Sequence, residues 1–346
     1  MKKLICILLA LALALGLAAC GQTPAPSSEP EPTQEPAAPT AQPTAEPEPA
    51  VFRIAGLKGP TTMGMVKLME GAENGAYAND YQVSMYGTAD EIVPLLTKGE
   101  LDMAAIPANL AATLYQKLEG EVQVAAINTL GVLYVVTTGD DIASVADLKG
   151  KTIYSTGKGT TPEYVLNYIL TQNGLDPAKD VTIEYKSEAT EVLATMQASS
   201  GYPVAVLPQP YVTTAQMQME GLNVALDLTQ EWDKVSPDSA LVTGVLLVRR
   251  EFADANPGAM QAFLQDYEAS IDWVNANTAD AAQLVAQYGI VPKAPIAEKA
   301  LPNCNIAFVA GADMKAKLSG YLAVLFEQEP ASVGGELPDD AFYYGA

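Results

Sequence analysis

The chain contains no histidine, and only three cysteines and three arginines in 346 residues. The absence of histidine excludes histidine-based catalytic triads, histidine proton shuttles and ordinary histidine-ligated zinc or haem sites. Acidic residues outnumber basic ones 41 to 19, and the net charge of −22 excludes nucleic acid as an expected partner. With 49% hydrophobic residues, the length predicts about two folded domains, at roughly 100 to 200 residues each.

The N-terminus has the composition of a secretory signal peptide. Met1-Lys2-Lys3 is basic and precedes the apolar run Leu4 to Leu17, which is short for a membrane-spanning helix. We therefore expect a signal peptide over residues 1–19. The sequence Leu17-Ala18-Ala19-Cys20-Gly21 resembles the bacterial lipobox, and this resemblance implies cleavage before Cys20 and lipidation of its sulfur. The alternative is an ordinary cleavage site followed by an incidental cysteine.

Residues 20–50 are expected to form a lipidated, disordered tether. After Cys20 they are mainly proline, glutamate, alanine, threonine and serine, without the large apolar side chains that would offset the entropy of ordering. Cys6 lies in the signal peptide, so Cys304 is the remaining cysteine of the mature fold and no intrachain disulfide is expected. We predict that Cys304 is a buried small hydrophobe, with a reactive thiol as the alternative.

From Val51 onward, short strand-like runs alternate with amphipathic helical stretches, a pattern that predicts an α/β fold with parallel sheets. The β-branched runs at 132–136 and 242–248 lie on either side of a second alternating series. We therefore expect two lobes, with a discontinuous lobe 1 (51–136 and 246–346) and lobe 2 at 137–245. The predicted strands are at 51–55, 82–86, 102–106, 122–128, 152–154, 182–185 and 204–207. The longest predicted helices are at 257–277, 279–288 and 312–326, and Thr88-Ala89-Asp90-Glu91 has capping-box spacing.

Several segments carry a family resemblance. They are Gly99 to Ala104, Asp147 to Ile153, Ser155 to Glu163, Asn173 to Pro177, and Arg250-Glu251-Phe252 followed by Asn256-Pro257. Together with the lipobox and the two lobes, they resemble ABC-importer solute-binding proteins of the nitrate, sulfonate, taurine and thiamine-precursor group. The resemblance spans roughly residues 51–288. It implies a type II periplasmic-binding-protein fold, a two-strand hinge, a ligand cleft and a membrane permease as partner, with no catalysis, cofactor or metal.

In open α/β sheets, ligands bind beyond the carboxyl ends of the strands, so the loops between strand and helix supply the candidate site. These loops are rich in hydroxyl, amide, glycine and aromatic residues. Gln209, held between two prolines, is the preferred specificity residue. For Thr161, the alternative to ligand contact is that it only caps its own helix. For the tyrosines, the alternative is a half-buried structural role, and for Met63 it is a role in packing. The predicted ligand-binding residues are Thr61, Thr62, Met63, Tyr86, Gly87, Asn109, Gly157, Thr160, Thr161, Gln209 and Tyr211.

The three arginines, Arg53, Arg249 and Arg250, lie within or at the ends of predicted strands, so a guanidinium clamp on an anion is not expected. This favours a neutral or weakly charged heterocycle over sulfonate, taurine or nitrate. The leading hypothesis is a monomeric, lipid-anchored, extracytoplasmic substrate-binding protein of an ABC importer. The alternatives are a surface sensor or adhesin on the same fold, and a histidine-free hydrolase built on carboxylates.

Overall fold

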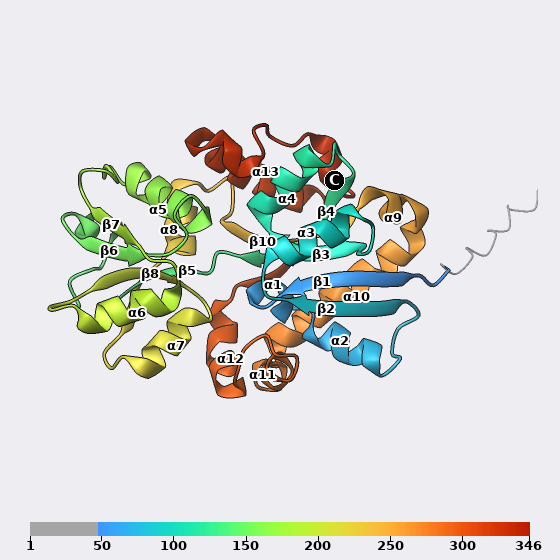
Figure 1. The fold of residues 1–346 in the computed structure, drawn as a ribbon, viewed down its shortest axis with the longest axis horizontal. Helices are drawn as coiled ribbons and strands as arrows, with labels where there is room; N and C mark the ends of the chain where they lie inside the picture. The colour runs from blue at the N-terminus through green and yellow to red at the C-terminus, as the bar shows by residue number, and fades with distance from the viewer. Residues whose placement is uncertain (1–47) are drawn as a thin grey trace, which may run out of the picture. The chain divides into compact units, whose positions relative to one another are not determined.

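The computed structural model describes residues 48–346, which form two β-sheets with helices on their faces (Figure 1). The predicted signal peptide, Cys20 and almost all of the predicted tether lie outside the described residues. No helix among residues 48–346 is both long and apolar enough to cross a membrane.

The first sheet has six strands in the order β11-β4-β10-β3-β1-β2. Strands β1, β2 and β3 are parallel, whereas β10 runs antiparallel to both β3 and β4. Ile54 of β1 pairs with Met103 of β3, and both side chains are completely buried, as expected for parallel strands covered on both faces. The strands are β1 (Val51–Leu57), β2 (Asp80–Tyr86), β3 (Met103–Pro107), β4 (Val122–Leu130), β10 (Val242–Arg249) and β11 (Ile306–Val309). Helices α1 (Pro60–Met63), α2 (Val66–Glu73), α3 (Ala89–Thr97) and α4 (Ala108–Lys117) alternate with the early strands.

The second sheet has five strands in the order β7-β6-β8-β5-β9. Strand β6 is parallel to β7 and β8, and β5 is antiparallel to β8 and β9. The strands are β5 (Leu133–Thr137), β6 (Thr152–Ser155), β7 (Thr182–Tyr185), β8 (Val204–Pro208) and β9 (Asn223–Asp227). The associated helices are η1 (Val145–Leu148), α5 (Thr161–Gln172), α6 (Ala189–Ala198), α7 (Tyr211–Gln218) and α8 (Leu228–Val235).

We call the first sheet with its helices lobe 1 and the second sheet with its helices lobe 2. The chain leaves lobe 1 after β4 ends at Leu130 and enters lobe 2 where β5 begins at Leu133; it returns between α8 and β10. The sheets therefore divide the chain a few residues earlier than expected. The run 132–136 pairs with β8 and β9, and residues 242–245 already pair within the first sheet.

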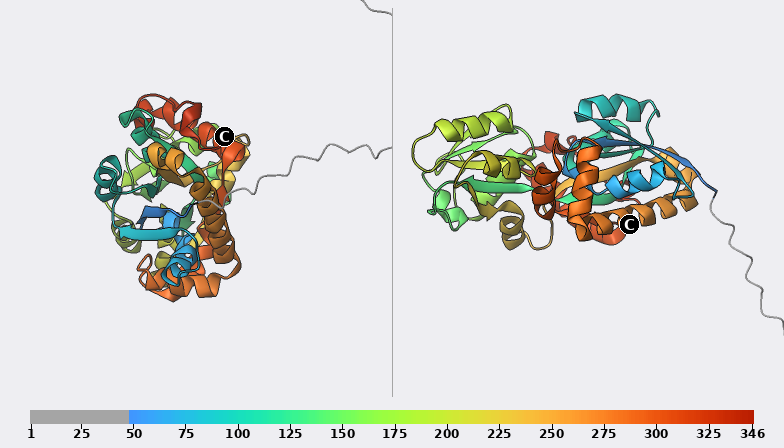
Figure 2. Two further views of the ribbon diagram at one scale, coloured as in Figure 1. Left: turned by 90° about the vertical axis from the view of Figure 1, so that its right-hand side faces the viewer. Right: turned by 90° about the horizontal axis from the view of Figure 1, so that it is seen from below.

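The terminal third of the chain is mainly helical and gathers on and beside lobe 1, drawn in orange and red (Figure 2). The predicted helices agree with α10, α11 and α13 to within two residues at each end. These elements are α9 (Arg250–Ala255), α10 (Pro257–Ala276), α11 (Thr278–Gln287), α12 (Ala294–Ala300), η2 (Leu301–Asn303), α13 (Gly311–Gln328), η3 (Pro330–Val333) and η4 (Asp340–Phe342).

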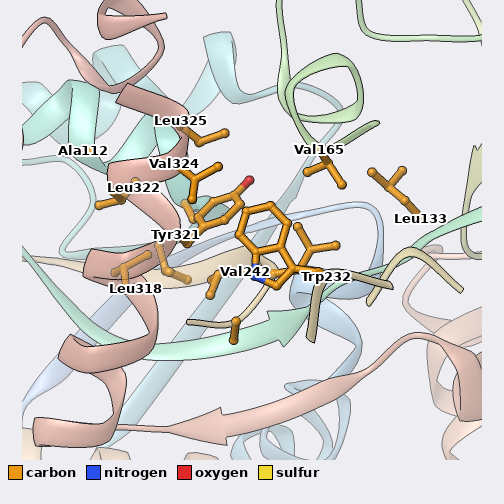
Figure 3. Close-up of a cluster of buried hydrophobic side chains, with 14 of the residues drawn as sticks. Ala112, Leu133, Val165, Trp232, Val242, Leu318, Tyr321, Leu322, Val324 and Leu325 are labelled. Carbon is orange, nitrogen blue, oxygen red and sulfur yellow. The ribbon is translucent and has the colours of Figure 1, made fainter. Parts of the chain in front are cut away.

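Helix α13 also packs against lobe 2, through an aromatic cluster of which Figure 3 shows Trp232 and Tyr321. The rings of Trp232 on α8 and Tyr321 on α13 have centroids 5.6 Å apart, and Tyr168 on α5 lies 4.7 Å from Trp232. Trp232 and Tyr321 are both completely buried. The two lobes therefore share one continuous hydrophobic core on this side of the molecule.

The prediction that Cys304 is a buried small hydrophobe is confirmed. It is a free cysteine with no exposed surface, and burial raises the pKa of its thiol to about 12. At neutral pH this thiol is fully protonated and shielded from solvent, so it is unreactive.

Candidate functional site

A cavity of about 380 Å³ lies between the lobes, at the edge where the parallel strands end. Both lobes and the crossing segment line it, and none of the lining residues is charged. Lobe 1 contributes Pro107, Asn109, Leu110 and Thr243; lobe 2 contributes Leu133, Thr160, Thr161, Pro162 and Pro208; and Val132 lies in the crossing segment. We call this cavity the cleft.

In lobe 1, Pro107 forms the junction between β3 and α4 at the cleft wall. It is the last residue of β3 and the residue before α4, and its ring fixes φ at −57° and leaves no amide for a continuing sheet. Asn109 follows in the first turn of α4, where its Nδ2 donates a hydrogen bond of 3.4 Å to the carbonyl oxygen of Ser332. The C-terminal segment thereby holds the Asn109 amide at the cleft wall.

In lobe 2, a tight turn after β6 carries the cleft threonines. Gly157 has a φ of 75°, and a Cβ at this position would lie 2.5 Å from Thr160 Oγ1, so only glycine fits. Thr160 Oγ1 donates to the Gly157 carbonyl oxygen at 2.7 Å. Thr161 then begins α5, with Pro162 at the second helical position.

The Tyr321 hydroxyl lies beside the side chain of Thr161, a residue that lines the cleft. It is completely buried and has no hydrogen-bond partner among the described residues. Burial raises the pKa of Tyr321, and the neighbouring Thr161 hydroxyl acts in the opposite direction. Thr161 of the cleft wall is therefore a neighbour of Tyr321, which belongs to the aromatic cluster that joins the lobes.

Of the eleven predicted ligand-binding residues, the structure brings Asn109, Thr160 and Thr161 together on the cleft. Their contact with a ligand stays a prediction. Gly157 shapes the turn that carries two of them. Tyr86 ends β2, Gly87 follows it and Tyr211 begins α7, and none of the three lines the cavity.

The three predicted ligand-binding residues of α1 are buried within lobe 1. Thr62 and Met63 have no exposed surface, and Thr61 is 8% exposed. Met63 packs in the hydrophobic core of lobe 1, which gives it the packing role rather than the ligand-binding one. The Thr61 carbonyl oxygen accepts a hydrogen bond of 3.1 Å from Asn128 Nδ2.

Gln209 does not line the cleft, and its amide oxygen turns toward the first turn of α7. Its side chain is buried, and its Oε1 accepts hydrogen bonds from Thr213 N at 3.3 Å and Thr213 Oγ1 at 2.9 Å. The amide oxygen thus satisfies the start of α7. This geometry gives the Gln209 amide oxygen a partner within the chain, and a role of Gln209 in specificity stays a prediction.

The cleft also contains residues that the loop rule missed. Val132 and Leu133 lie where the chain crosses into lobe 2, and Thr243 lies near the start of β10. Because the rule considers only loops that follow parallel strands, it passes over these crossing segments. The sequence feature that could have indicated them is their position next to the predicted hinge between the lobes.

All three arginines lie away from the cleft, at the opposite edge of the first sheet. Arg53 pairs with Asp102 through Nε at 2.8 Å and Nη2 at 2.5 Å, and Arg249 lies 3.8 Å from the same carboxylate. Arg250 Nε donates to the Gly120 carbonyl oxygen at 2.8 Å. Asp102 precedes β3 and Arg249 ends the antiparallel strand β10, so these contacts lie at the amino ends of β1 and β3.

The NMT1-like family model matches residues 61–290, which is more than half of the chain. The chain belongs to the NMT1-like family. This NMT1-like protein is 27% identical over 210 residues to a binding protein of Brucella abortus. The match covers 60% of this chain and 61% of the relative, so the chain spans about three fifths of the length of the curated relatives it matches.

Superposition on solved structures shows which fold this NMT1-like protein has. A protein described as an ABC transporter from Parabacteroides distasonis superposes with a TM-score of 0.71 at 23% identity, covering 85% of this chain and 98% of that one. The periplasmic aliphatic sulphonate binding protein SsuA from Escherichia coli superposes with a TM-score of 0.65 at 19% identity, covering 85% and 92%. The predicted periplasmic-binding-protein fold is confirmed.

Proposed function

We propose that this NMT1-like protein is the extracytoplasmic substrate-binding component of an ABC importer. The observation that carries the proposal is a cleft lined from two lobes, with polar groups suited to binding and no charged residue on its walls. The names of the Brucella relative and of the solved structures support a binding role. The ligand is a small organic solute that leaves the protein chemically unchanged.

Capture follows from closure of the lobes. Asn109 on lobe 1 offers an amide, and Thr160 and Thr161 on lobe 2 offer hydroxyls, while Leu110 and Leu133 offer apolar contact. A ligand that touches both walls only in the closed state shifts the population toward that state. The closed form is then what the permease recognises, and the protein works as a monomer.

The anchor is part of the same proposal. Lipid on Cys20 holds the protein at the outer face of the cell membrane, and the acidic, proline-rich segment keeps the folded part away from the bilayer. In cells fed radiolabelled palmitate, the wild-type protein is expected to carry label and the Cys20→Ser variant none. A labelled Cys20→Ser variant would contradict the anchor.

The binding role is tested by native mass spectrometry of the full chain isolated from its own cells. We expect an intact small molecule to be released on denaturation, and to be missing from a Thr160→Trp variant whose new side chain fills the cleft. Thr171→Trp, at an exposed position near the far end of helix α5, which Thr160 precedes, is the matched control and is expected to retain the molecule. Retention by Thr160→Trp would contradict the site, and release of a chemically altered molecule would contradict a purely binding role.

A further inference from the structure

The walls of the cleft are mainly aliphatic and carry only neutral polar groups. Ten residues line it, of which six are aliphatic, namely Pro107, Leu110, Val132, Leu133, Pro162 and Pro208, and four are polar, namely Asn109, Thr160, Thr161 and Thr243. None of these ten residues has an aromatic ring or a charge. A cavity of about 380 Å³ has the size of a small-molecule site, and such walls favour a ligand that is mostly aliphatic.

The tyrosines of the neighbouring elements do not supply a stacking surface in the cleft. Tyr86 and Tyr211 are absent from its walls, and the Tyr164 hydroxyl on α5 donates to the Gly159 carbonyl oxygen at 2.9 Å. An aromatic heterocycle, which the sequence favours as a ligand, would therefore find no ring face to stack on among these walls.

Charged side chains near the cleft loops are engaged elsewhere. Glu91 caps α3, because its Oε2 accepts hydrogen bonds of 2.9 Å from the two backbone amides that precede the helix, and the charge of Lys58 acts on its carboxylate. Lys158 and Glu163 line a separate cavity beside α5 and β7 of lobe 2. A charged ligand group in the cleft would lose its hydration without gaining an opposite charge, which is costly.

The polar side chains of the cleft face a ligand mainly as acceptors, because they use their donors within the protein. The Thr160 hydroxyl donates to the Gly157 carbonyl oxygen at 2.7 Å, which leaves its lone pairs to accept. Asn109 Nδ2 donates to the Ser332 carbonyl oxygen at 3.4 Å, which leaves its Oδ1 to accept. The three prolines of the walls have no N–H group to offer. The ligand must therefore bring a donor of its own.

The start of α4 supplies donors on the lobe 1 side of the cleft. Helix α4 begins at Ala108, and no side chain caps it. Its first amides lie in the wall that Asn109 and Leu110 form, so they can donate to a carbonyl oxygen. An amide group matches both sides, because its carbonyl oxygen accepts from α4 of lobe 1 and its N–H donates to Thr160 of lobe 2.

We infer that the cleft binds an uncharged aliphatic carboxamide, which it recognises through both the carbonyl oxygen and the N–H. This inference rests on the proposed binding function and names its substrate class. Because the two ends of one amide group contact different lobes, such a ligand joins the lobes and favours the closed state. A molecule without the N–H leaves the acceptors of Thr160 and Asn109 buried without a partner, which lowers its affinity.

The first test is isothermal titration calorimetry of the full chain, stripped of bound molecules, with three probes of one size. Hexanamide carries the N–H group, 2-heptanone replaces the amide nitrogen by a methyl group, and hexanoate replaces it by a negatively charged oxygen. Hexanamide is expected to bind about tenfold more tightly than either of the others, because an unpaired buried acceptor or an uncompensated charge weakens binding by at least that factor.

A second pair of probes tests the aliphatic character of the walls. Cyclohexanecarboxamide and benzamide carry the same amide group on a saturated and an aromatic ring. Cyclohexanecarboxamide is expected to bind at least as tightly as benzamide, because the walls offer aliphatic contact and no ring for stacking.

Thr160→Val and the matched control Thr171→Val assign the effect to the cleft. Valine keeps the branched shape of threonine without its hydroxyl, and Thr171 is exposed near the far end of α5. Thr160→Val is expected to reduce the affinity ratio of hexanamide to 2-heptanone by about fivefold, whereas Thr171→Val leaves the ratio unchanged. Asn109→Leu, on the other lobe, is expected to reduce the same ratio, so the test does not depend on the loop of Thr160 keeping its shape.

Three results would overturn the inference. They are 2-heptanone or hexanoate binding as tightly as hexanamide, benzamide binding more tightly than cyclohexanecarboxamide, and a preference for hexanamide that survives in both Thr160→Val and Asn109→Leu. If none of the probes binds, the molecule released from protein isolated from its own cells decides: an uncharged aliphatic amide supports the inference, and any other molecule overturns it. Failure of the proposed function has a different signature, because then no small molecule is released.

Discussion

The two lobes meet in two very different ways. At the cleft they face each other across about 380 Å³ of open space lined by threonine, proline, asparagine and aliphatic side chains. At the aromatic cluster, the completely buried Trp232 and Tyr321 pack against each other, and the half-buried Tyr168 packs on Trp232. The comparison indicates that the filled side holds the lobes together and the open side is kept for a ligand.

Trp232→Ala is expected to have the largest effect. Trp232 is completely buried between the lobes, and its Nε1 donates to Ser239 Oγ at 2.9 Å. Its removal leaves a large cavity and should lower the free energy of unfolding by about 3 to 5 kcal/mol. Urea denaturation followed by circular dichroism measures this loss.

The chain's other tryptophan is the control for this change. Trp273 is half-buried on α10, with the Lys67 ammonium 4.5 Å above its ring. Trp273→Ala should cost clearly less than Trp232→Ala. Equal losses would show that the aromatic cluster has no special weight in joining the lobes.

A matched pair of leucines compares the two sides directly. Leu322 on α13 is completely buried in the shared core, whereas Leu110 on α4 is half-buried and lines the cleft. Leu322→Ala should cost about 2 to 5 kcal/mol of unfolding free energy, and Leu110→Ala about 1 kcal/mol or less. Thermal unfolding of both variants ranks them, and a reversed order would contradict the assignment of filled and open sides.

The Glu91 cap should make a small, pH-dependent contribution on the cleft side. Because its amide bonds lower the folded-state pKa of Glu91, the cap stabilises above the unfolded pKa and is lost as pH falls through the folded pKa. Wild-type protein should therefore be more stable than Glu91→Gln at neutral pH, with the difference shrinking on acidification. Melting temperatures from neutral to acid pH measure it, and a pH-independent difference would refute a role for the charge.

Tyr321→Phe should have the smallest effect. The buried hydroxyl has no hydrogen-bond partner among residues 48–346, so removing it should change the free energy of unfolding by about 0.5 kcal/mol or less, in either direction. Differential scanning calorimetry against the wild-type protein measures the change. A loss well above this size would mean that the hydroxyl bonds to a group such as Thr161 in solution.

Much of the fold follows from local sequence pattern. The run 182–185 is predicted and observed as a strand with the same bounds, and α10 ends one residue before its predicted end, because both are marked by clear periodicity and by flanking turn or proline residues. Strands β9 and β11 were not predicted. Both are short edge strands with half-exposed residues, and their pairing depends on partners far away in the chain.

The site was less accessible to sequence reasoning than the fold. The rule that ligands lie beyond strand ends predicts the loops of Asn109, Thr160 and Thr161, because topology alone brings these loops to one edge. It does not predict side-chain direction: the Gln209 amide oxygen bonds to Thr213 in α7, and Met63 packs in the core of lobe 1. Thr243 was missed because its place in the cleft depends on where the chain crosses between lobes.

The most direct test of capture by closure is a distance measurement between the lobes. Spin labels at Asp90→Cys on α3 and Thr190→Cys on α6 stand on exposed helix starts at the facing sheet edges, and the buried Cys304 should remain unlabelled. Pulsed electron resonance would compare protein loaded with its own co-purified molecule and protein stripped of it. The account predicts a shorter distance in the loaded protein, and the same distance in both states would contradict it.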